Sequence, residues 1–461
     1  MAYWGVAMAN FHPLWSPPSE AELKKGTQAL SFAQAAAQKT KREAEYIEAI
    51  SAFYNNWESI PHRTRCLAFE QAMADLHTRY PDDKEAAIFY ALSLVAAADP
   101  ADKTYQKQKN AGSILSALYP NEPNHPGIVH YLIHAYDYPG LAQLGLPAAR
   151  RYAAVAPSSA HALHMPSHIF TRLGLWDECI QSNLASVSSA KCYAEAAGIK
   201  GHWDEELHGL DYLVYAYLQK GENDSAKKQW DYLKAIETVY PVNFKVAFAF
   251  AAIPSRYLVE NRLWKEAARL EVTPQGFSWG NFPWQKAMIH YTRVLGAVHV
   301  DDLPAARKEW KELQTIYDTL LMQKKTYEAN LVQVQVDAAG AWILFKEGKK
   351  NEAWQLMLKA ADREDKTEKH PVTPGEIVPA RELLGNMLLE MAEPEKALQA
   401  YEADLKIRPN RFNALYGAAK AAQKFGDLQK ARFYYQQLLA VAGRTSSNRS
   451  EIAEAQHYLK G

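Results

Sequence analysis

The sequence predicts an all-α fold built from stacked antiparallel helix pairs. Three observations predict it: small and aromatic residues that recur with a fixed period near the C-terminus, glycines spaced as helix ends through the middle of the chain, and a scarcity of β-branched alternation. A single helix pair buries its apolar face only against neighbouring pairs, so one continuous array is expected.

The most regular repeats lie near the C-terminus. From Leu383, the stretch LLGNMLLEMAEPEKALQAYEADLKIRPN carries the tetratricopeptide pattern, with Ala397 and Tyr401 at two signature positions. The same small and aromatic pair returns one full tetratricopeptide period later as Ala431 and Tyr435. The small residue lets two helices lie close together, and the ring fills the gap between pairs. The period therefore predicts a tetratricopeptide-like right-handed superhelix, curved enough to enclose a groove or to approach a closed toroid.

The small position can be followed backwards through the chain. It falls at Cys179, Ala226, Ala267, Ala306 and Ala353, and Gly174 and Gly221 end the preceding helices of two of these units. The intervals between these positions are unequal and longer than the ideal period, which predicts longer helices or larger loops than in the ideal repeat. A Pro-containing segment, Lys369 to Glu376, is the best boundary. We therefore expect an irregular superhelix over residues 1–368 and regular C-terminal pairs over 369–461, continuous with it.

Composition excludes several functional classes. The 461 residues include 52 Lys plus Arg and 52 Asp plus Glu, so the basic excess that nucleic-acid binding needs is absent. The three cysteines do not suggest a disulfide framework. No apolar run is long enough to span a membrane. No leader precedes the first helix-like segment, which as written predicts a cytoplasmic protein.

Histidine is the residue type that points to a functional site, because eight of the fifteen lie between His125 and His208. His130 and His134 lie four apart in HYLIHA, on one helix face. A second such pair, His164 and His168, follows one tetratricopeptide period later in HALHMPSHI. The two pairs therefore occupy equivalent positions on the first helices of consecutive units.

These positions face the concave side of a tetratricopeptide superhelix, and adjacent first helices pack about 8–10 Å apart. The next unit places further polar residues at the same positions. The predicted ligand-binding set is His130, His134, His161, His164, His168, His208, Asp211 and Tyr215. A histidine alone in a helix more often makes a structural hydrogen bond, but five imidazoles in register make a poor core.

Two chemistries fit this set. Neutral imidazoles at i, i+4 can bind a divalent transition metal through His130, His134, His164 and His168, with Asp211 completing the shell. The alternative is a hydrogen-bonding cradle for a small anionic ligand, a peptide or a protein partner. The zinc-protease motif H-E-x-x-H is absent, because Tyr131 and Met165 take the place of its Glu. The leading interpretation is a binding scaffold with a His-lined concave groove, the alternative is a metal-dependent enzyme using the same histidines, and no catalytic residue is assigned.

Five segments resemble a large bacterial family of tetratricopeptide-repeat proteins. They are MAYWGVAMAN, PNHPGIVHYLIHA, AHALHMPSHIFTRLG, LHGLDYL and DREDKTEKHPVTPGEIVPARELLGNMLL. The resemblance covers nearly the whole chain, and its motif histidines match at His125, His130, His134, His161, His164 and His168. Similar chains carry another helix before the AYWG segment, so this chain resembles one shortened at its N-terminus. They also have an Asn-His pair where LHGLDY stands here. The resemblance implies the fold and the site, and no activity.

Overall fold

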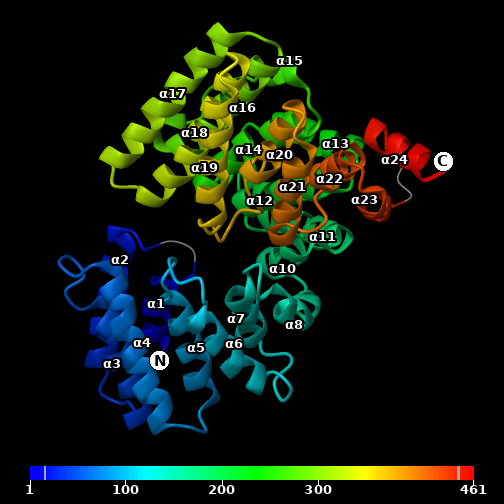
Figure 1. Cartoon of the computed structure of the whole chain (residues 1–461). Helices are drawn as coiled ribbons and strands as arrows, with labels where there is room; N and C mark the ends of the chain where they lie inside the picture. Colours follow the sequence, from blue (N-terminus) through cyan, green and yellow to red (C-terminus); the bar gives the residue numbers. More distant parts are fainter. Residues whose placement is uncertain (15–16, 444–446, 461) are drawn as a thin grey trace. The chain divides into compact units, whose positions relative to one another are not determined.

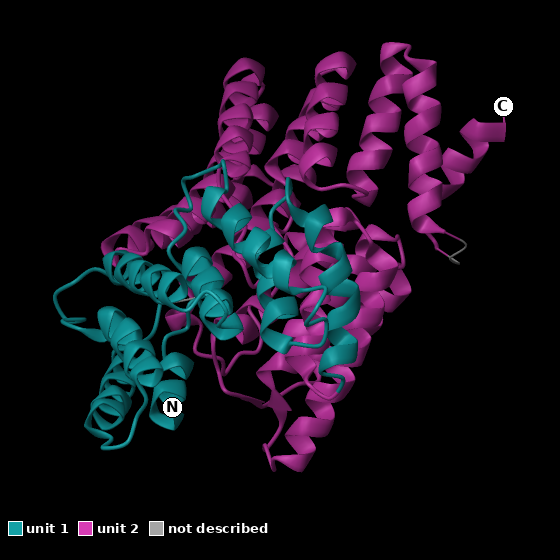
Figure 2. Ribbon diagram, turned by 90° about the horizontal axis from the view of Figure 1, so that it is seen from below, with its two compact units in different colours: residues 1–157 teal, residues 158–461 magenta. Residues whose placement is uncertain are grey.

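The structure is a computed structural model that describes residues 1–14, 17–443 and 447–460, and nearly all its regular structure is helical (Figure 1). The chain divides into two compact units, residues 1–157 and 158–461, which are coloured separately in Figure 2. In the described part, strands are limited to β1 (His202–Trp203) and β2 (Val239–Tyr240), a short parallel pair. No described helix is long and apolar enough to cross a membrane.

Unit 1 is a run of helices, each packed against the next. They are α1 (Ala2–Ala9), α2 (Glu20–Ala35), α3 (Lys41–Tyr54), α4 (His62–Arg79), α5 (Lys84–Ala96), α6 (Gln106–Leu118), α7 (Pro126–Tyr136) and α8 (Ala142–Val155). Local sequence sets several starts. Ser19 and Thr40 each form a capping box with the Glu three residues later, which satisfies backbone N–H groups at the first turns of α2 and α3.

Unit 2 continues the same construction. Its helices are α9 (Ala160–His164), α10 (Pro166–Leu173), α11 (Trp176–Ala196), α12 (Asp204–Gln219), α13 (Asn223–Lys234), α14 (Phe244–Glu260), α15 (Trp264–Ala267), η1 (Trp279–Asn281), α16 (Pro283–His299), α17 (Leu303–Met322), α18 (Thr326–Lys346), α19 (Lys350–Asp365), α20 (Ala380–Glu390), α21 (Pro394–Ile407), α22 (Phe412–Phe425), α23 (Leu428–Ala442) and α24 (Ser450–Lys460). Most consecutive helices contact one another.

The predicted all-α, tetratricopeptide-like class is confirmed, and so is the role of the small residues. Every predicted small position is fully buried: Cys179, Ala226, Ala267, Ala306, Ala353, Ala397 and Ala431. Gly174 and Gly221 end α10 and α12 in the left-handed conformation, with φ of 65° and 69°. The wide spacing of the repeats comes from long helices, since α11 and α18 have 21 residues whereas α21 and α22 have 14.

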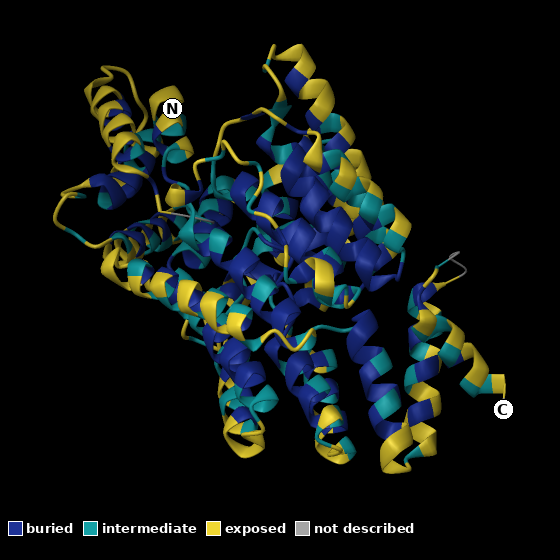
Figure 3. Cartoon of the chain, turned by 90° about the horizontal axis from the view of Figure 1, so that it is seen from above, coloured by how far each residue is buried: buried dark blue, intermediate teal, exposed yellow. Residues whose placement is uncertain are grey.

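Helix α12 lies at the centre of unit 2. Every residue of it except Glu205 is buried, because α9, α11, α13, α14 and α22 all pack on it. Figure 3 shows such fully buried helices in dark blue, beside outer helices that alternate buried and exposed residues. The contact between α12 and α22 joins segments that are far apart in the sequence, so the array of unit 2 bends until early and late repeats meet.

The Pro-containing segment between α19 and α20, residues 366–379, is a loop, as expected. It lies within unit 2, so the boundary expected between residues 368 and 369 does not coincide with the division at residues 157 and 158. Helices α19 and α20 on either side of it contact one another. The expected division stays a prediction, and the loop matters below because it lies against the candidate site.

Candidate metal centre

Two histidines of the predicted set are placed by a break between α9 and α10. His164 is the last residue of α9, and Pro166 begins α10 because its missing N–H costs nothing at a first helical position. The chain keeps its helical direction closely enough that His164 and His168 still share one face. Their Nε2 atoms lie 3.1 Å apart.

A third histidine comes from α12, which packs against α9. The ring centroid of His208 lies 4.2 Å from that of His164. One ligand atom from each of His164, His168 and His208 can be chosen so that all three lie within 4.8 Å of one another. Among the described residues, this is the one group of three or more His, Cys, Asp or Glu side chains with that geometry.

Asn183 of α11 determines which ring nitrogen of His164 carries the proton. The Asn183 Nδ2 group donates to the Cys179 carbonyl oxygen at 2.8 Å, which directs its Oδ1 toward His164. Oδ1 lies 2.7 Å from His164 Nδ1, so that nitrogen carries the proton and donates. The Nε2 atom of a neutral His164 therefore keeps its lone pair, which is the form that binds a metal.

Burial favours the neutral form of His164 and His208. His164, His168 and His208 are 1%, 3% and 7% exposed. Desolvation lowers the pKa of His164 well below its usual value, and the neighbouring His168 lowers it further. Desolvation likewise lowers the pKa of His208 well below its usual value, with His164 as the next cause. Because His164 carries its proton on Nδ1, the 3.1 Å hydrogen bond between the two Nε2 atoms is donated by His168, and a metal would bind His168 Nε2 once that proton has moved to Nδ1.

Tyr212 links the histidines to the loop over residues 366–379. It follows His208 by one turn of α12, and its ring lies edge-on to His164 with centroids 4.6 Å apart. The Tyr212 hydroxyl donates to the Val372 carbonyl oxygen at 3.1 Å. Arg256 of α14 also donates to this loop, at the carbonyl oxygens of Gly375 and Glu376. The loop is therefore anchored on α12 and α14, next to the predicted site residues of α12.

Asp211 and Tyr215 lie on the predicted face but have other partners. The Asp211 carboxylate forms a buried ion pair with Arg256, and desolvation nevertheless raises its pKa to about 6. The Tyr215 hydroxyl accepts a hydrogen bond from Arg411 at 3.1 Å. Arg411 is itself buried between Glu260 and Glu382. The Asp211 carboxylate is thus bound by Arg256, and its predicted place in a metal shell stays a prediction.

His161 lies at the edge of the cluster, one turn before His164. Its Nδ1 is 4.0 Å from Glu205 Oε2, and Lys245 binds the Glu205 and Asp204 carboxylates. Burial lowers the pKa of His161, and Glu205 opposes that change. Glu205 precedes His208 by three residues on one face of α12. Its Oε2 atom is buried and has no hydrogen-bond partner within the described ranges.

His130 and His134 belong to unit 1, on α7. Their Nε2 atoms are 3.1 Å apart, the same spacing as in the His164 and His168 pair. The His130 ring stacks on Tyr152 of α8 with centroids 5.5 Å apart. His125 caps the N-terminus of α7 and pairs with Glu85. The prediction that the pairs of both units bind one ion stays a prediction.

Sequence reasoning missed several groups that shape the site. Asn183, Tyr212 and Arg256 come from α11, α12 and α14, outside the positions used for the concave face. Only Tyr212 carried a local signal, because it follows His208 by four residues. Asn183 and Arg256 carried no such signal, because α11 and α14 each contain several other polar residues.

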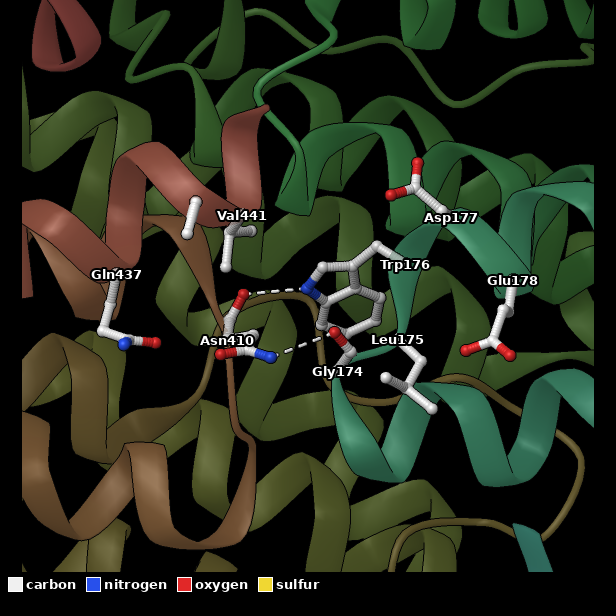
Figure 4. Close-up of a pocket in the computed structure, with 9 residues that line it drawn as sticks. Gly174, Leu175, Trp176, Asp177, Glu178, Asn410, Gln437 and Val441 are labelled. Atoms are coloured by element: carbon white, nitrogen blue, oxygen red, sulfur yellow. Dashed lines mark hydrogen bonds between the residues drawn. The ribbon is translucent and has the colours of Figure 1, made fainter. Parts of the chain in front are cut away.

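The larger of the two described pockets, about 270 Å³, is a separate feature of unit 2. Figure 4 shows it where the turn between α10 and α11 meets the turn between α21 and α22. Trp176 Nε1 donates to the Asn410 carbonyl oxygen, and Asn410 Nδ2 donates to that of Gly174. None of the predicted histidines lines it. We interpret these bonds as a structural joint between early and late repeats.

Comparison with known proteins identifies no family. No protein-family model matches the chain, and no curated protein matches it. Solved tetratricopeptide structures are similar at low identity. The human IFIT1 dimer with PPP-AAAA is 11% identical over 92% of this chain and 88% of that chain, with a TM-score of 0.39. A tetratricopeptide repeat protein from Parabacteroides merdae is 12% identical over 72% and 99%, with a TM-score of 0.28. The P58(IPK) TPR domain is 15% identical over 82% and 98%, with a TM-score of 0.23. At these values none of the three bears on function.

Proposed function

We propose that unit 2 is a repeat scaffold that binds a divalent transition metal through His164, His168 and His208. The observation that carries this proposal is the convergence of three buried imidazoles whose ligand atoms lie within 4.8 Å of one another. A core of this size has no need of three adjacent imidazoles, because buried polar groups cost free energy unless they are well bonded.

Distances support a zinc-type ion. With Zn–N bonds of about 2.0–2.1 Å and tetrahedral angles, two ligand nitrogens lie about 3.3 Å apart. The Nε2 atoms of His164 and His168 are 3.1 Å apart, so small ring movements suffice. The Asn183 bond to His164 Nδ1 is the outer-shell contact that metal-binding histidines commonly make. An all-nitrogen set favours zinc, copper or nickel over magnesium or calcium.

Three protein ligands leave a fourth position for another group. Structural zinc sites have four protein ligands, whereas sites that bind water, an anion or a substrate have three. The small anionic ligand or peptide carboxylate expected from the sequence would bind the ion at this position. This joins the two chemistries in one site, with the metal supplying the positive charge that buried, neutral histidines lack.

A metal-dependent enzyme is the second candidate, and Glu205 is the observation that favours it. Its carboxylate lies one helical turn from His208, and its Oε2 has no hydrogen-bond partner in the described part of the chain. A carboxylate beside a metal-bound water can act as a general base. If this is correct, Glu205→Gln will retain the metal and lose activity, and loss of metal would instead assign Glu205 a structural role.

Metal content and affinity test the main proposal. We expect purified chain to bind one zinc ion per molecule after removal of adventitious metal by a chelator. His164→Ala, His168→Ala and His208→Ala should each weaken zinc binding at least 100-fold, because each removes one of three ligands. His202→Ala is the matched control, since this histidine pairs with Glu206. Equal zinc binding by the wild type and all three variants would overturn the proposal.

The same titration tests the pair in unit 1. The four-histidine hypothesis expects His134→Ala to abolish binding of the ion, whereas a site formed by unit 2 alone expects wild-type affinity. A second zinc ion that only His134→Ala removes would place a separate site on α7.

A further inference from the structure

The ring of Tyr212 packs against all three proposed metal ligands. Its centroid lies 4.6 Å from that of His164, 5.4 Å from that of His168 and 5.5 Å from that of His208. Tyr212 is fully buried and follows His208 by one turn of α12. Closely packed rings leave little free space, so a change in the orientation of these imidazoles must also move Tyr212.

Binding of an ion requires such a change in the imidazoles. The Nε2 atom of His168 donates a hydrogen bond to that of His164, so in this arrangement the two nitrogens cannot both bind an ion. An ion would replace this hydrogen bond with two metal–nitrogen bonds, and a third bond from His208 would fix the remaining ring. The cluster therefore has two arrangements, one joined by a hydrogen bond between imidazoles and one joined by an ion.

The hydroxyl end of Tyr212 is bonded to the loop over residues 366–379. It donates to the Val372 carbonyl oxygen at 3.1 Å. A second connection runs through the ion pair between Asp211 of α12 and Arg256, because Arg256 donates to two further carbonyl oxygens of the same loop. Both connections begin on α12, within about one turn of the proposed metal ligand on that helix. The loop is therefore linked to the histidines through α12.

The loop has little regular structure with which to hold itself in place. Residues 366–379 contain no helix or strand, and three of them are prolines, which have no backbone N–H. The N–H groups of Val372 and Thr373 both donate back to His370, so these bonds lie within the loop. Segments of this kind open locally at a low cost in free energy. A single contact from α12 is therefore enough to change how often the loop opens.

We propose that an ion bound by the three histidines holds this loop closed through Tyr212, an inference that rests on the proposed metal site. Three bonds to one ion fix the rings against which Tyr212 packs, and a fixed Tyr212 keeps its hydroxyl on the Val372 carbonyl oxygen. Coupling between two sites is reciprocal, so the loop contact in turn strengthens binding of the ion. The loop thus responds to the metal, and it opens more readily when the ion is absent.

Hydrogen exchange of the loop amides measures this coupling in the full-length chain, with and without a saturating concentration of zinc. The reporting amides are those of Val372, Thr373 and residues 375–378, because the prolines between and beside them have none. Zinc should slow their exchange about two- to tenfold, which is the equilibrium effect of one ordinary hydrogen bond. His164→Ala removes a proposed ligand and should abolish this response to zinc.

Two tyrosines give a matched pair of variants. Tyr212→Phe keeps the ring and removes the hydroxyl, so it should bind zinc at most about tenfold more weakly than the wild type, yet lose the slowing of loop exchange by zinc. Tyr327→Phe removes an equivalent bond, because the Tyr327 hydroxyl of α18 donates to the Glu368 carbonyl oxygen of the same loop at 2.8 Å. It should speed loop exchange at all zinc concentrations and keep the response to zinc.

The outcomes separate this inference from the proposed metal site. Zinc binding by the wild type without a change in loop exchange would overturn the coupling alone, and so would a full response in Tyr212→Phe or in His164→Ala. Loss of the response in Tyr327→Phe as well would show that any loosening of the loop removes it, which would overturn the role of Tyr212. Absence of zinc binding by the wild type would overturn both the metal site and the coupling.

Discussion

Replacing Asn183 by Leu tests how the protein prepares its metal site. Leu fills a similar volume but accepts no hydrogen bond, so the proton on His164 Nδ1 loses its 2.7 Å acceptor and keeps only the Ser167 Oγ at 3.4 Å. The ring is then free to rotate or to place its proton on Nε2, the atom proposed to bind the ion. Both changes oppose metal binding without removing any ligand.

The magnitude follows from the bond that is lost. The Nδ1 to Oδ1 distance is 2.7 Å and Asn183 is fully buried, so no water is placed to replace the amide oxygen. Loss of such an outer-shell partner lowers metal affinity about 10–100-fold, which is about 1.4–2.7 kcal/mol. A buried donor left unsatisfied also lowers the free energy of unfolding by about 1–3 kcal/mol.

Competition with a chromophoric zinc chelator measures the affinity, and urea unfolding of the metal-free chain measures the stability. Ser186→Ala is the matched control, because Ser186 lies on α11 near Asn183, is fully buried and donates to the Ala160 carbonyl oxygen at 2.8 Å. It should lower stability and leave zinc affinity unchanged. A folded Asn183→Leu chain with wild-type zinc affinity would refute the reasoning, and so would an equal loss of affinity in Ser186→Ala.

Three further predictions concern unit 2. Gly174→Ala should lower the free energy of unfolding by about 2 kcal/mol or more in denaturant melts, since the new Cβ would lie 2.4 Å from the Pro409 carbonyl oxygen. Gly348→Ala is its control and should cost about 1 kcal/mol, because the backbone is left-handed there too but no atom lies within 4 Å of the new Cβ. Arg411→Met should cost about 3–5 kcal/mol in the same melts, because it leaves the Glu260 and Glu382 carboxylates buried without their partner; a loss under about 1 kcal/mol would contradict this. Burial lowers the pKa of His299 to about 4, so the unfolded chain takes up a proton first as the pH falls, and the free energy of unfolding decreases below about pH 6.5. His299→Phe should remove about 2 kcal/mol of the stability lost between pH 7 and pH 5, and an unchanged pH dependence of unfolding would contradict this prediction.

The histidine pairs show which contacts can be predicted from the spacing of residues along one helix. Residues four apart on a helix must share a face, so the spacing alone placed His164 beside His168. His208 was expected from the helix of the next repeat, and its ring packs directly on His164. That contact depends on how closely α12 approaches α9, which is a property of the packed helices and not of either sequence segment.

Asp211 and Tyr215 show the opposite limit. Helix periodicity predicted which face of α12 carries these two residues. It did not predict which side chains bind them. Arg256 is 45 residues from Asp211, and Arg411 is 196 residues from Tyr215. A side chain's charge is visible in the sequence, whereas the group that neutralises it is chosen by long-range contacts.

The sequence by itself determined the class of fold, because helix pairs that pack closely require small residues at fixed intervals, and that requirement is local. It also predicted that imidazoles gather on the first helices of neighbouring repeats. Only the tertiary structure decided which histidines converge, which carboxylates form ion pairs with arginines, and that the loop over residues 366–379 is bonded to α12 and α14 and lines a cavity. These features arise where segments that are distant in the sequence meet, and no periodicity within a segment encodes such a meeting.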